Sequence, residues 1–371
     1  MNADEAKAEV LRAGNELVER GLVARTWGNA SCRISGELCA ITPSGIAYDR
    51  LTLDDISVVN INTLEYEGRR KPSSEKGIHA AAYRLMPQVN FVIHTHQAFA
   101  SAMSITGFLG SALTGKEKDL LGGGIDFSAY GLPGTKTLSR NVERALRRNN
   151  GAILMERHGA LLTGTDRQSA FGRAVLLEEL CRCSLPVATD CEKKTYSERT
   201  QDNFTLTHNS ASSSFQLNSA FKVQDNAIAL LHAAIYTAYP DIRHIAHIGS
   251  APVLGAMEKQ EIMPAMLDDF AQMVGVDAKI DRTPCEKITQ AAAQGIAKKL
   301  RNRNCLCVEG MGALCCAGDE SDCSALMMIV EKNALACVHA AKTGKAAPLS
   351  FIDRQLMRFV YTHKYAKKAK G

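Results

Sequence analysis

The stretch Phe91-Val92-Ile93-His94-Thr95-His96 is an apolar run that ends in two histidines separated by one residue. In a β-strand, side chains at positions i and i+2 point to the same face, so His94 and His96 would present two imidazoles from one rigid element. Two such imidazoles form half of a catalytic site for a zinc-like ion, which takes three or four nitrogen or oxygen ligands. His158, at the end of a second apolar run, and Glu75 are the candidates for the remaining ligands.

A single histidine in an apolar segment is more often a hydrogen-bonded core residue than a metal ligand. The ordered set in this chain is more specific than any one of its members. Pro72-Ser73-Ser74-Glu75 precedes the histidine pair, and a second apolar run ends at His158-Gly159. We therefore predict a metal centre rather than three unrelated buried histidines.

The composition is that of a soluble globular protein. The chain has 371 residues, of which 46% are hydrophobic and 22% are charged, and this length is sufficient for two domains. We find no apolar run long enough to cross a membrane, and the N-terminus begins a polar amphipathic helix rather than a secretory signal. The twelve cysteines lack C-x-x-C spacing and are typical of small buried residues in a reducing compartment. We expect a cytoplasmic protein with no membrane partner.

The net charge of +5 is modest and spread along the chain, except for the basic tail at 364–370. A dedicated nucleic-acid-binding protein usually gathers its basic residues on one face. We therefore expect no nucleic-acid partner, and we interpret the tail as a solvated helix end.

Helices and strands alternate along the first half of the chain. Residues 4–21 have the pattern of an amphipathic helix closed by Gly21, and residues 31–34 and 38–41 that of a β-hairpin. Glu75 opens a helix that ends at Met86, because a proline follows. This order indicates an α/β or α+β fold. The other expected elements are a strand at 56–61, the strand of His94, helices at 97–104, 138–148 and 166–185, and the strand that ends at His158.

The sequence also contains an internal repeat. A shift of 153 residues aligns the chain with itself over roughly ninety residues, and agreement at one offset indicates a duplicated fold. The identical pairs include His79 with His232, Tyr83 with Tyr236, His94 with His247, Gly159 with Gly312, and Asp166 with Asp319.

The two copies differ at the predicted metal ligands. The alignment pairs His96 with Gly249, His158 with Met311, and Glu75 with Ile228. The second copy, which starts near Ala220, therefore cannot build the same metal site, and we expect it to be structural. We predict a catalytic domain at 1–205, a Ser-rich linker at 206–219 and a degenerate repeat at 220–371.

Five motifs in the first half share one order and spacing with a known family: Gly28-Asn29-Ala30-Ser31, Thr42-Pro43-Ser44-Gly45, Pro72-Ser73-Ser74-Glu75, His94-Thr95-His96 and His158-Gly159. They resemble those of the class II aldolase/adducin family, and most of all its fuculose-phosphate aldolases. The resemblance covers about residues 5–185. It implies an α/β fold of three layers, α/β/α, present here in tandem.

The resemblance also implies roles for individual residues. His94, His96 and His158 would hold Zn²⁺, or another divalent ion such as Mn²⁺ or Co²⁺, with Glu75 as a ligand that becomes the acid/base once substrate binds. The phosphate of a sugar substrate would lie on glycine N–H groups, hydroxyls and an amide, which suit an anion, although the same residues also mark turns and helix caps. These residues are Gly28, Asn29, Ser44, Gly45, Ser73 and Ser74.

The chain departs from the family pattern at its tyrosines. The family uses a tyrosine in the loop after the helix that follows the histidine pair, but residues 106–118 contain none, and Tyr130 matches a different position. Family members also take a C-terminal tyrosine from a neighbouring subunit. We predict that the second repeat lends Tyr361 or Tyr365 to the first copy's site, although both could simply pack a terminal helix. Fourfold rings are common in the family, so we expect a homo-oligomer in which a dimer forms a pseudo-fourfold ring.

Three functions are compatible with these observations. The first is a zinc-dependent aldolase that acts on a small phosphorylated ketose, favoured because Glu75 rather than aspartate follows the two serines. The second keeps the metal but carries out decarboxylation, dehydration or epimerisation of a related compound. The third is a non-enzymatic, adducin-like interaction protein.

Overall fold

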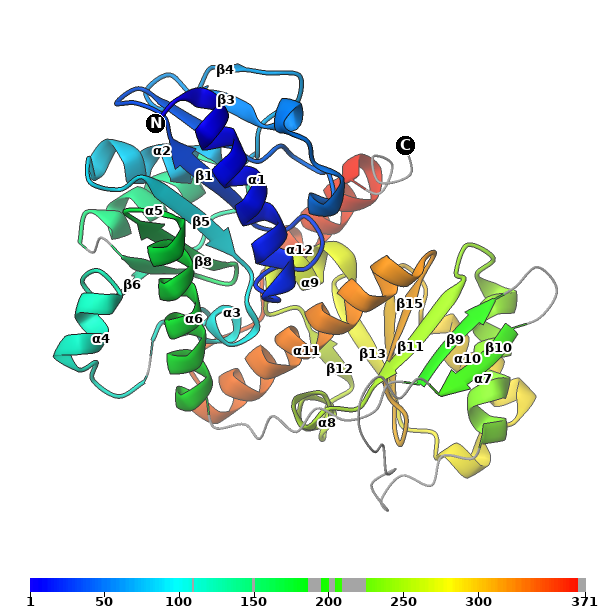
Figure 1. The fold of residues 1–371 in the computed structure, drawn as a ribbon. Helices are drawn as coiled ribbons and strands as arrows, with labels where there is room; N and C mark the ends of the chain where they lie inside the picture. The colour runs from blue at the N-terminus through cyan, green and yellow to red at the C-terminus, as the bar shows by residue number, and fades with distance from the viewer. Residues whose placement is uncertain (109, 149–150, 186–194, 200–203, 209–224, 366–371) are drawn as a thin grey trace. The chain divides into compact units, whose positions relative to one another are not determined.

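The computed structural model describes residues 1–365 except 109, 149–150, 186–194, 200–203 and 209–224. The chain divides into two compact units (Figure 1). The first comprises Met1–Pro186 with His363–Gly371, and the second comprises Val187–Thr362. Each unit is built on a single mixed β-sheet.

The first unit contains an eight-stranded sheet in the order β4-β3-β2-β1-β5-β8-β7-β6. Neighbouring strands are antiparallel except β6 and β7, which are parallel. The predicted hairpin is present as β1 and β2, and the His94 run is the central strand β5. The strands are β1 (Asn29–Arg33), β2 (Leu38–Ile41), β3 (Ser57–Asn60), β4 (Tyr66–Glu67), β5 (Phe91–Thr95), β6 (Ile125–Ser128), β7 (Ala152–Met155) and β8 (Gly159–Gly164).

Helices cover both faces of this sheet and complete the three-layer α/β/α arrangement (Figure 1). On one face, α2 and α5 enclose an apolar core with strand residues such as Val92 and Leu161. On the other face, α1 packs on β1, and α3 and α6 pack on β8. The helices are α1 (Ala3–Glu19), α2 (Lys76–Leu85), α3 (Ala98–Met103), α4 (Gly115–Leu120), α5 (Lys136–Leu146) and α6 (Arg167–Ser184).

The second unit contains a seven-stranded sheet in the order β10-β9-β11-β15-β14-β13-β12. Its only parallel pair among the described strands is β13 with β14. The strands are β9 (Thr195–Arg199), β10 (Phe204–His208), β11 (His244–Ile248), β12 (Ile262–Pro264), β13 (Asp277–Asp281), β14 (Cys305–Val308) and β15 (Gly312–Ala317). The helices are α7 (Asp225–Ala238), α8 (Ala251–Met257), α9 (Asp268–Met273), α10 (Gln290–Lys298), α11 (Glu320–Thr343) and α12 (Phe351–Val360).

The internal repeat is confirmed strand by strand. The bounds of β11, β14 and β15 are those of β5, β7 and β8 moved by 153 residues, and the strands pair in the same order. A shared glycine shows the same packing in both copies. A Cβ on Gly159 would lie 2.1 Å from the carbonyl oxygen of Thr95, and a Cβ on Gly312 would lie 2.3 Å from that of Ile248. The fold is therefore a tandem duplication at the level of backbone contacts.

The sequence predicts that the first domain ends at residue 205 and that the second copy starts near Ala220. The second unit of the structure begins before both of these positions. Strand β9 lies next to β11 and β10 lies beyond it, as β1 lies next to β5 and β2 lies beyond it. Ser197 pairs with Ile245 as Ser31 pairs with Val92, so this hairpin follows an offset of 166 rather than 153 residues. A repeat search at one offset could not find it. The expected linker overlaps β10 at 206–208, and its remainder lies outside the described residues.

By length and composition, α11 is the one helix in the described part of the chain that could cross a membrane. The sequence expectation had excluded such a segment. Its apolar stretch is 67% buried, and the helix packs on β11, β15 and α8 within the second unit. The apolar composition of α11 is therefore explained by its place in the core of the second unit.

We predict opposite effects for two glycine substitutions in the second unit. Gly312→Ala should lower the free energy of unfolding by about 2–4 kcal/mol, because Gly312 has φ +75° and its Cβ would overlap a strand backbone. Gly295→Ala, in the middle of α10 with no atom near its Cβ, should raise it by about 0.5–1 kcal/mol. Urea unfolding of the full chain measures both, and equal effects would contradict the close strand approach.

Candidate metal centre

The four predicted ligands converge on one end of the first unit's sheet. His94 lies near the end of β5, and His96 follows just after it. His158 occupies the turn between β7 and β8, and Glu75 is the N-cap residue of α2. All four side chains are buried, with exposed fractions of 0% for His94, 2% for His158, 8% for Glu75 and 9% for His96.

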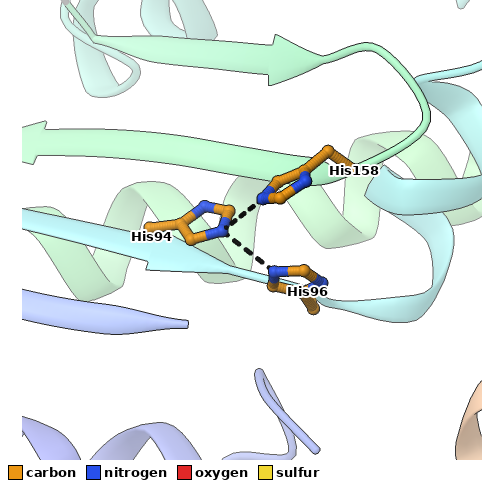
Figure 2. A group of neighbouring side chains, drawn as sticks. All are labelled: His94, His96 and His158. Atoms are coloured by element: carbon orange, nitrogen blue, oxygen red, sulfur yellow. Dashed lines mark hydrogen bonds between the residues drawn. The ribbon is translucent and has the colours of Figure 1, made fainter. Parts of the chain in front are cut away.

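The three imidazoles point their Nε2 atoms at one another (Figure 2). His94 Nε2 lies 2.9 Å from His96 Nε2 and 2.9 Å from His158 Nε2. The Glu75 carboxylate joins them, with Oε2 3.3 Å from His94 Nε2 and Oε1 3.0 Å from His158 Nε2. Four potential ligand atoms from four separate positions in the sequence therefore face one small volume.

The hydrogen bond of His94 fixes which of its ring nitrogens faces the cluster. Its Nδ1 lies 2.9 Å from the carbonyl oxygen of Ala160, which can only accept, so Nδ1 carries the proton and Nε2 carries a lone pair. One lone pair cannot accept hydrogen bonds from His96 and His158 at the same time. A backbone-oriented imidazole with its free nitrogen turned inward is the usual arrangement of a metal-ligating histidine.

A buried oxygen without a hydrogen bond gives a second test of fit. Oε1 of Glu75 lies 3.0 Å from Nε2 of His158 but makes no well-aligned hydrogen bond among the described residues, although buried carboxylate oxygens normally have one. Three imidazole nitrogens and one carboxylate oxygen are donors that suit zinc and similar divalent ions. The residues present therefore fit a divalent metal ion, and their donor types do not select one metal.

Burial and charge act in opposite directions on Glu75. Burial raises the pKa of its carboxyl group, but His94, His158 and His96 outweigh burial and hold the pKa well below the ordinary value. The cluster thus favours an ionised Glu75 carboxylate, the protonation state that a metal ligand requires.

The structure brings four of the predicted phosphate-binding residues side by side. The segment of Ser44 and Gly45 forms an antiparallel bridge with the segment of Ser73 and Ser74, through Pro43 and Pro72. Two backbone hydrogen bonds support it: Ser44 N–H to Lys71 O at 3.0 Å and Ser73 N–H to Thr42 O at 3.0 Å. Ser73 is buried and its Oγ accepts from the N–H of Glu75, whereas Ser74 is exposed. The two serines therefore lie in different environments.

The other two predicted phosphate residues have contacts of their own. Gly28 has φ +103°, and a Cβ there would lie 2.6 Å from the carbonyl oxygen of His94, so close backbone approach alone requires glycine. Asn29 donates from Nδ2 to Oε2 of Glu75 at 3.0 Å. Asn29 is thus linked directly to the candidate metal centre. The backbone of Tyr365 is described, but its side chain lies outside the described residues.

Sequence reasoning missed a polar network behind Glu75. His79, Ser31 and Tyr83 are buried between β1 and α2 and are connected by hydrogen bonds. Burial lowers the pKa of His79 to about 3, so its ring is neutral. The available signal was the internal repeat, which pairs both His79 and Tyr83 with identical residues.

The second unit lacks the corresponding centre. His247 and His232 remain, with their Nε2 atoms 2.7 Å apart, and Ile228 and Met311 are buried where Glu75 and His158 lie in the first copy. No set of three ligands lies wholly within the described residues of this unit.

The pKa of His79 predicts a pH dependence of stability. Below about pH 6.5 the unfolded chain binds a proton at this residue that the folded chain does not bind until about pH 3. Stability should therefore fall with decreasing pH, by about 1.4 kcal/mol per unit for this group. Urea unfolding of metal-free protein between pH 7 and pH 4.5 should give a shallower slope for His79→Gln. A slope for His79→Gln equal to that of the wild type would contradict the prediction.

Comparison with known proteins places the chain in a family. Among curated relatives, the L-ribulose-5-phosphate 4-epimerase UlaF of Salmonella typhi is 33% identical over 195 residues, which cover 47% of this chain and 82% of the relative. Among solved structures, an L-fuculose 1-phosphate aldolase is 30% identical with a TM-score of 0.44, over 48% of this chain and 84% of the other. The L-fuculose-1-phosphate aldolase of Thermus thermophilus is 27% identical with a TM-score of 0.40, over 47% and 90%. The family model for the class II aldolase and adducin N-terminal domain matches residues 8–185 and again 193–338, so the chain belongs to this family.

Proposed function

We propose that this chain is a metal-dependent aldolase that cleaves or forms a C–C bond in a small phosphorylated ketose, with its active site in the first copy. The observation that carries the proposal is the convergence of three imidazole Nε2 atoms and one carboxylate in a buried cluster. Membership of the class II aldolase and adducin family supports it. The name of the curated relative, an epimerase of a sugar phosphate, gives the substrate class that we propose.

In this proposal His94, His96 and His158 hold the ion, with Glu75 as a further ligand in the absence of substrate. A bound divalent ion supplies Lewis acidity, which polarises a carbonyl oxygen and stabilises negative charge that develops on it. The protein's own part is to keep the ligand atoms aligned. The hydrogen bond from His94 to the carbonyl of Ala160 fixes one imidazole, and the ladder between β5 and β8 fixes the backbone from which the ligands project.

Glu75 is the residue that we propose moves the proton. Its Oε2 is held by Asn29, while its Oε1 faces Nε2 of His158 at 3.0 Å without a well-aligned hydrogen bond among the described residues. An oxygen with a free lone pair beside the cluster can accept a proton from a substrate carbon or hydroxyl and return it. Because the other oxygen stays tethered, the carboxylate keeps its direction during this exchange.

The bridged segments at Ser44, Gly45, Ser73 and Ser74 are the proposed phosphate site. They precede α2, whose N-terminal end favours negative charge, and Ser74 is exposed and able to reach an anion. Gly28 and Asn29 complete the predicted set. The location beside Glu75 would place a phosphorylated substrate with its other end near the metal ligands.

Two alternatives use the same residues differently. A metal-dependent epimerase, decarboxylase or dehydratase would use the same ion and carboxylate, and one observation, the 33% identity to an epimerase, favours the epimerase among them. The products decide between these reactions, because aldol cleavage gives two fragments and epimerisation keeps the carbon skeleton. An adducin-like protein without enzyme activity is disfavoured by the complete ligand set in the first copy.

We further propose, by analogy with the family, a cytoplasmic homo-oligomer in which a dimer forms a pseudo-fourfold ring. By the same analogy, we propose that Tyr361 or Tyr365 of the second copy contributes its side chain to the active site of the first copy. Size measurement in solution tests the first proposal, and single Tyr→Phe variants test the second.

The metal centre predicts the ion content of the purified protein. We expect about one divalent ion per chain by elemental analysis, and loss of the ion in a His94→Ala, His96→Ala double variant, because two of three imidazole ligands are removed. The matched control is His247→Ala, at the position that corresponds to His94 in the second copy, which should keep the ion. A wild-type protein without metal, and without uptake of zinc, manganese or cobalt, would rule out the metal-dependent functions.

The proposed acid/base predicts the effect of Glu75→Gln. Turnover should fall by about 10²-fold to 10⁴-fold, since glutamine cannot accept a proton, while its oxygen can still face Asn29. The assay follows products by NMR after incubation of the metal-loaded protein with ketose 1-phosphates and pentulose 5-phosphates. Glu179→Gln, on the exposed face of α6, is the control and should not change turnover. Epimerised product without fragments would replace the aldolase assignment by the epimerase alternative.

A further inference from the structure

A continuous chain of hydrogen bonds runs from Glu75 into the core of the first unit. Oε2 of Glu75 accepts from Nδ2 of Asn29 at 3.0 Å, and Oδ1 of Asn29 contacts Nε2 of His79. Nδ1 of His79 lies 2.7 Å from Oγ of Ser31, which lies 2.8 Å from the hydroxyl of Tyr83. Asn29, His79, Ser31 and Tyr83 are all at most 4% exposed. These links are therefore shielded from bulk water.

The chemistry of the groups fixes the direction of every link. An ionised carboxylate only accepts, so the amide N–H₂ of Asn29 must face Glu75 and its carbonyl must face His79. Nε2 of His79 then donates to that carbonyl, and Nδ1 of the neutral ring accepts from Ser31. The hydroxyl of Tyr83 donates to Ser31 in turn. Each link in this chain therefore has one donor and one acceptor, in a single consistent direction.

We propose that His79 is a positioning residue, which holds the side-chain amide of Asn29 in the one orientation that donates to Glu75. Without a donor at Nε2, the buried carbonyl of Asn29 would lose its partner, and the amide could turn until its N–H₂ no longer meets Oε2 of Glu75. The carboxylate would then lose a hydrogen bond at a buried charged group, which is unfavourable. Glu75 would move or lose its alignment with the three histidines. The inference rests on the proposed metal function and extends it to a residue that touches neither metal nor substrate.

The second copy shows which part of this arrangement is shared. His232 and Tyr236 are buried at the positions of His79 and Tyr83, but Ile228 replaces the carboxylate. There Nε2 of His232 lies 2.7 Å from Nε2 of His247. A histidine at this place can therefore serve packing in either copy, whereas orientation of an amide toward a carboxylate occurs only in the first. This difference supplies a matched control.

Two variants of His79 separate the roles of its ring nitrogens. Asparagine places an amide near the position of Nδ1 and leaves Asn29 without its donor, and glutamine reaches the position of Nε2 with an N–H₂ group. The readout is the affinity of metal-free full-length protein for zinc alone, measured by competition with a chromogenic chelator. The visible spectrum of the cobalt-loaded protein reports the ligand geometry independently. His232→Asn is the control for general effects on the fold.

We expect His79→Asn to lower zinc affinity by about 10-fold to 100-fold, as is usual for partners of metal ligands, and His79→Gln and His232→Asn to remain within about threefold of wild type. If both His79 variants bind zinc equally well, or equally poorly, the positioning role is wrong. Should His79→Asn fail to fold, Asn29→Ala breaks the same chain one link closer to Glu75 and should give the same loss; unchanged affinity there also overturns the inference.

Failure of the proposed function is distinguishable from failure of this inference. Wild-type protein that binds no zinc overturns both, and that result is read without any variant. Wild-type protein that binds zinc but converts no sugar phosphate overturns the aldolase proposal alone. The affinity difference between His79→Asn and His79→Gln is measured without substrate, so it decides the positioning role in that case too.

Discussion

The close antiparallel approach of β5 and β8 is the constraint on which the candidate site depends. The two strands meet where Gly159 leaves room for the carbonyl oxygen of Thr95, and a side chain there would push them apart. This contact sets the distance between the His94–His96 end of β5 and the turn that carries His158. The ligands are therefore positioned by a hydrogen-bonded ladder and not by long loops, which favours a preorganised site.

Burial of the ligand cluster costs free energy of folding unless its polar groups have hydrogen-bond partners or bind an ion. Three imidazoles and a carboxylate lie within an apolar sheet and its covering helices, where unpaired charge is strongly disfavoured. Part of the cost is offset by Asn29 and by the carbonyl of Ala160, each of which satisfies one polar atom. Oε1 of Glu75 makes no well-aligned hydrogen bond among the described residues, and the inward lone pair of His94 faces two imidazole nitrogens at once. A cation would use both, which links the stability of this region to metal binding.

Much of the fold around the candidate metal centre was predictable because it follows local sequence patterns, such as the alternation of side chains along a strand. Strand alternation placed His94 and His96 on one face, and the proline after Met86 set the end of α2. The hairpin of β9 and β10 was not predictable from the repeat, because its spacing from β11 differs from that of β1 and β2 from β5. The network through His79 was also missed. Its members come from β1 and α2, and only the three-dimensional packing of helix on strand brings them together.

The two copies show how one scaffold accommodates either a polar or an apolar centre. Replacement of Glu75 by Ile228 and of His158 by Met311 exchanges buried polar groups for hydrophobic ones, which removes their desolvation cost. The strand contact at Gly312 is kept, and the Nε2 atoms of the remaining His232 and His247 contact each other. Loss of the ligands therefore need not destabilise the sheet. The backbone geometry that builds a site in the first copy remains useful for packing in the second, and this is the physical reason that a duplicated domain can lose its metal ligands and keep its fold.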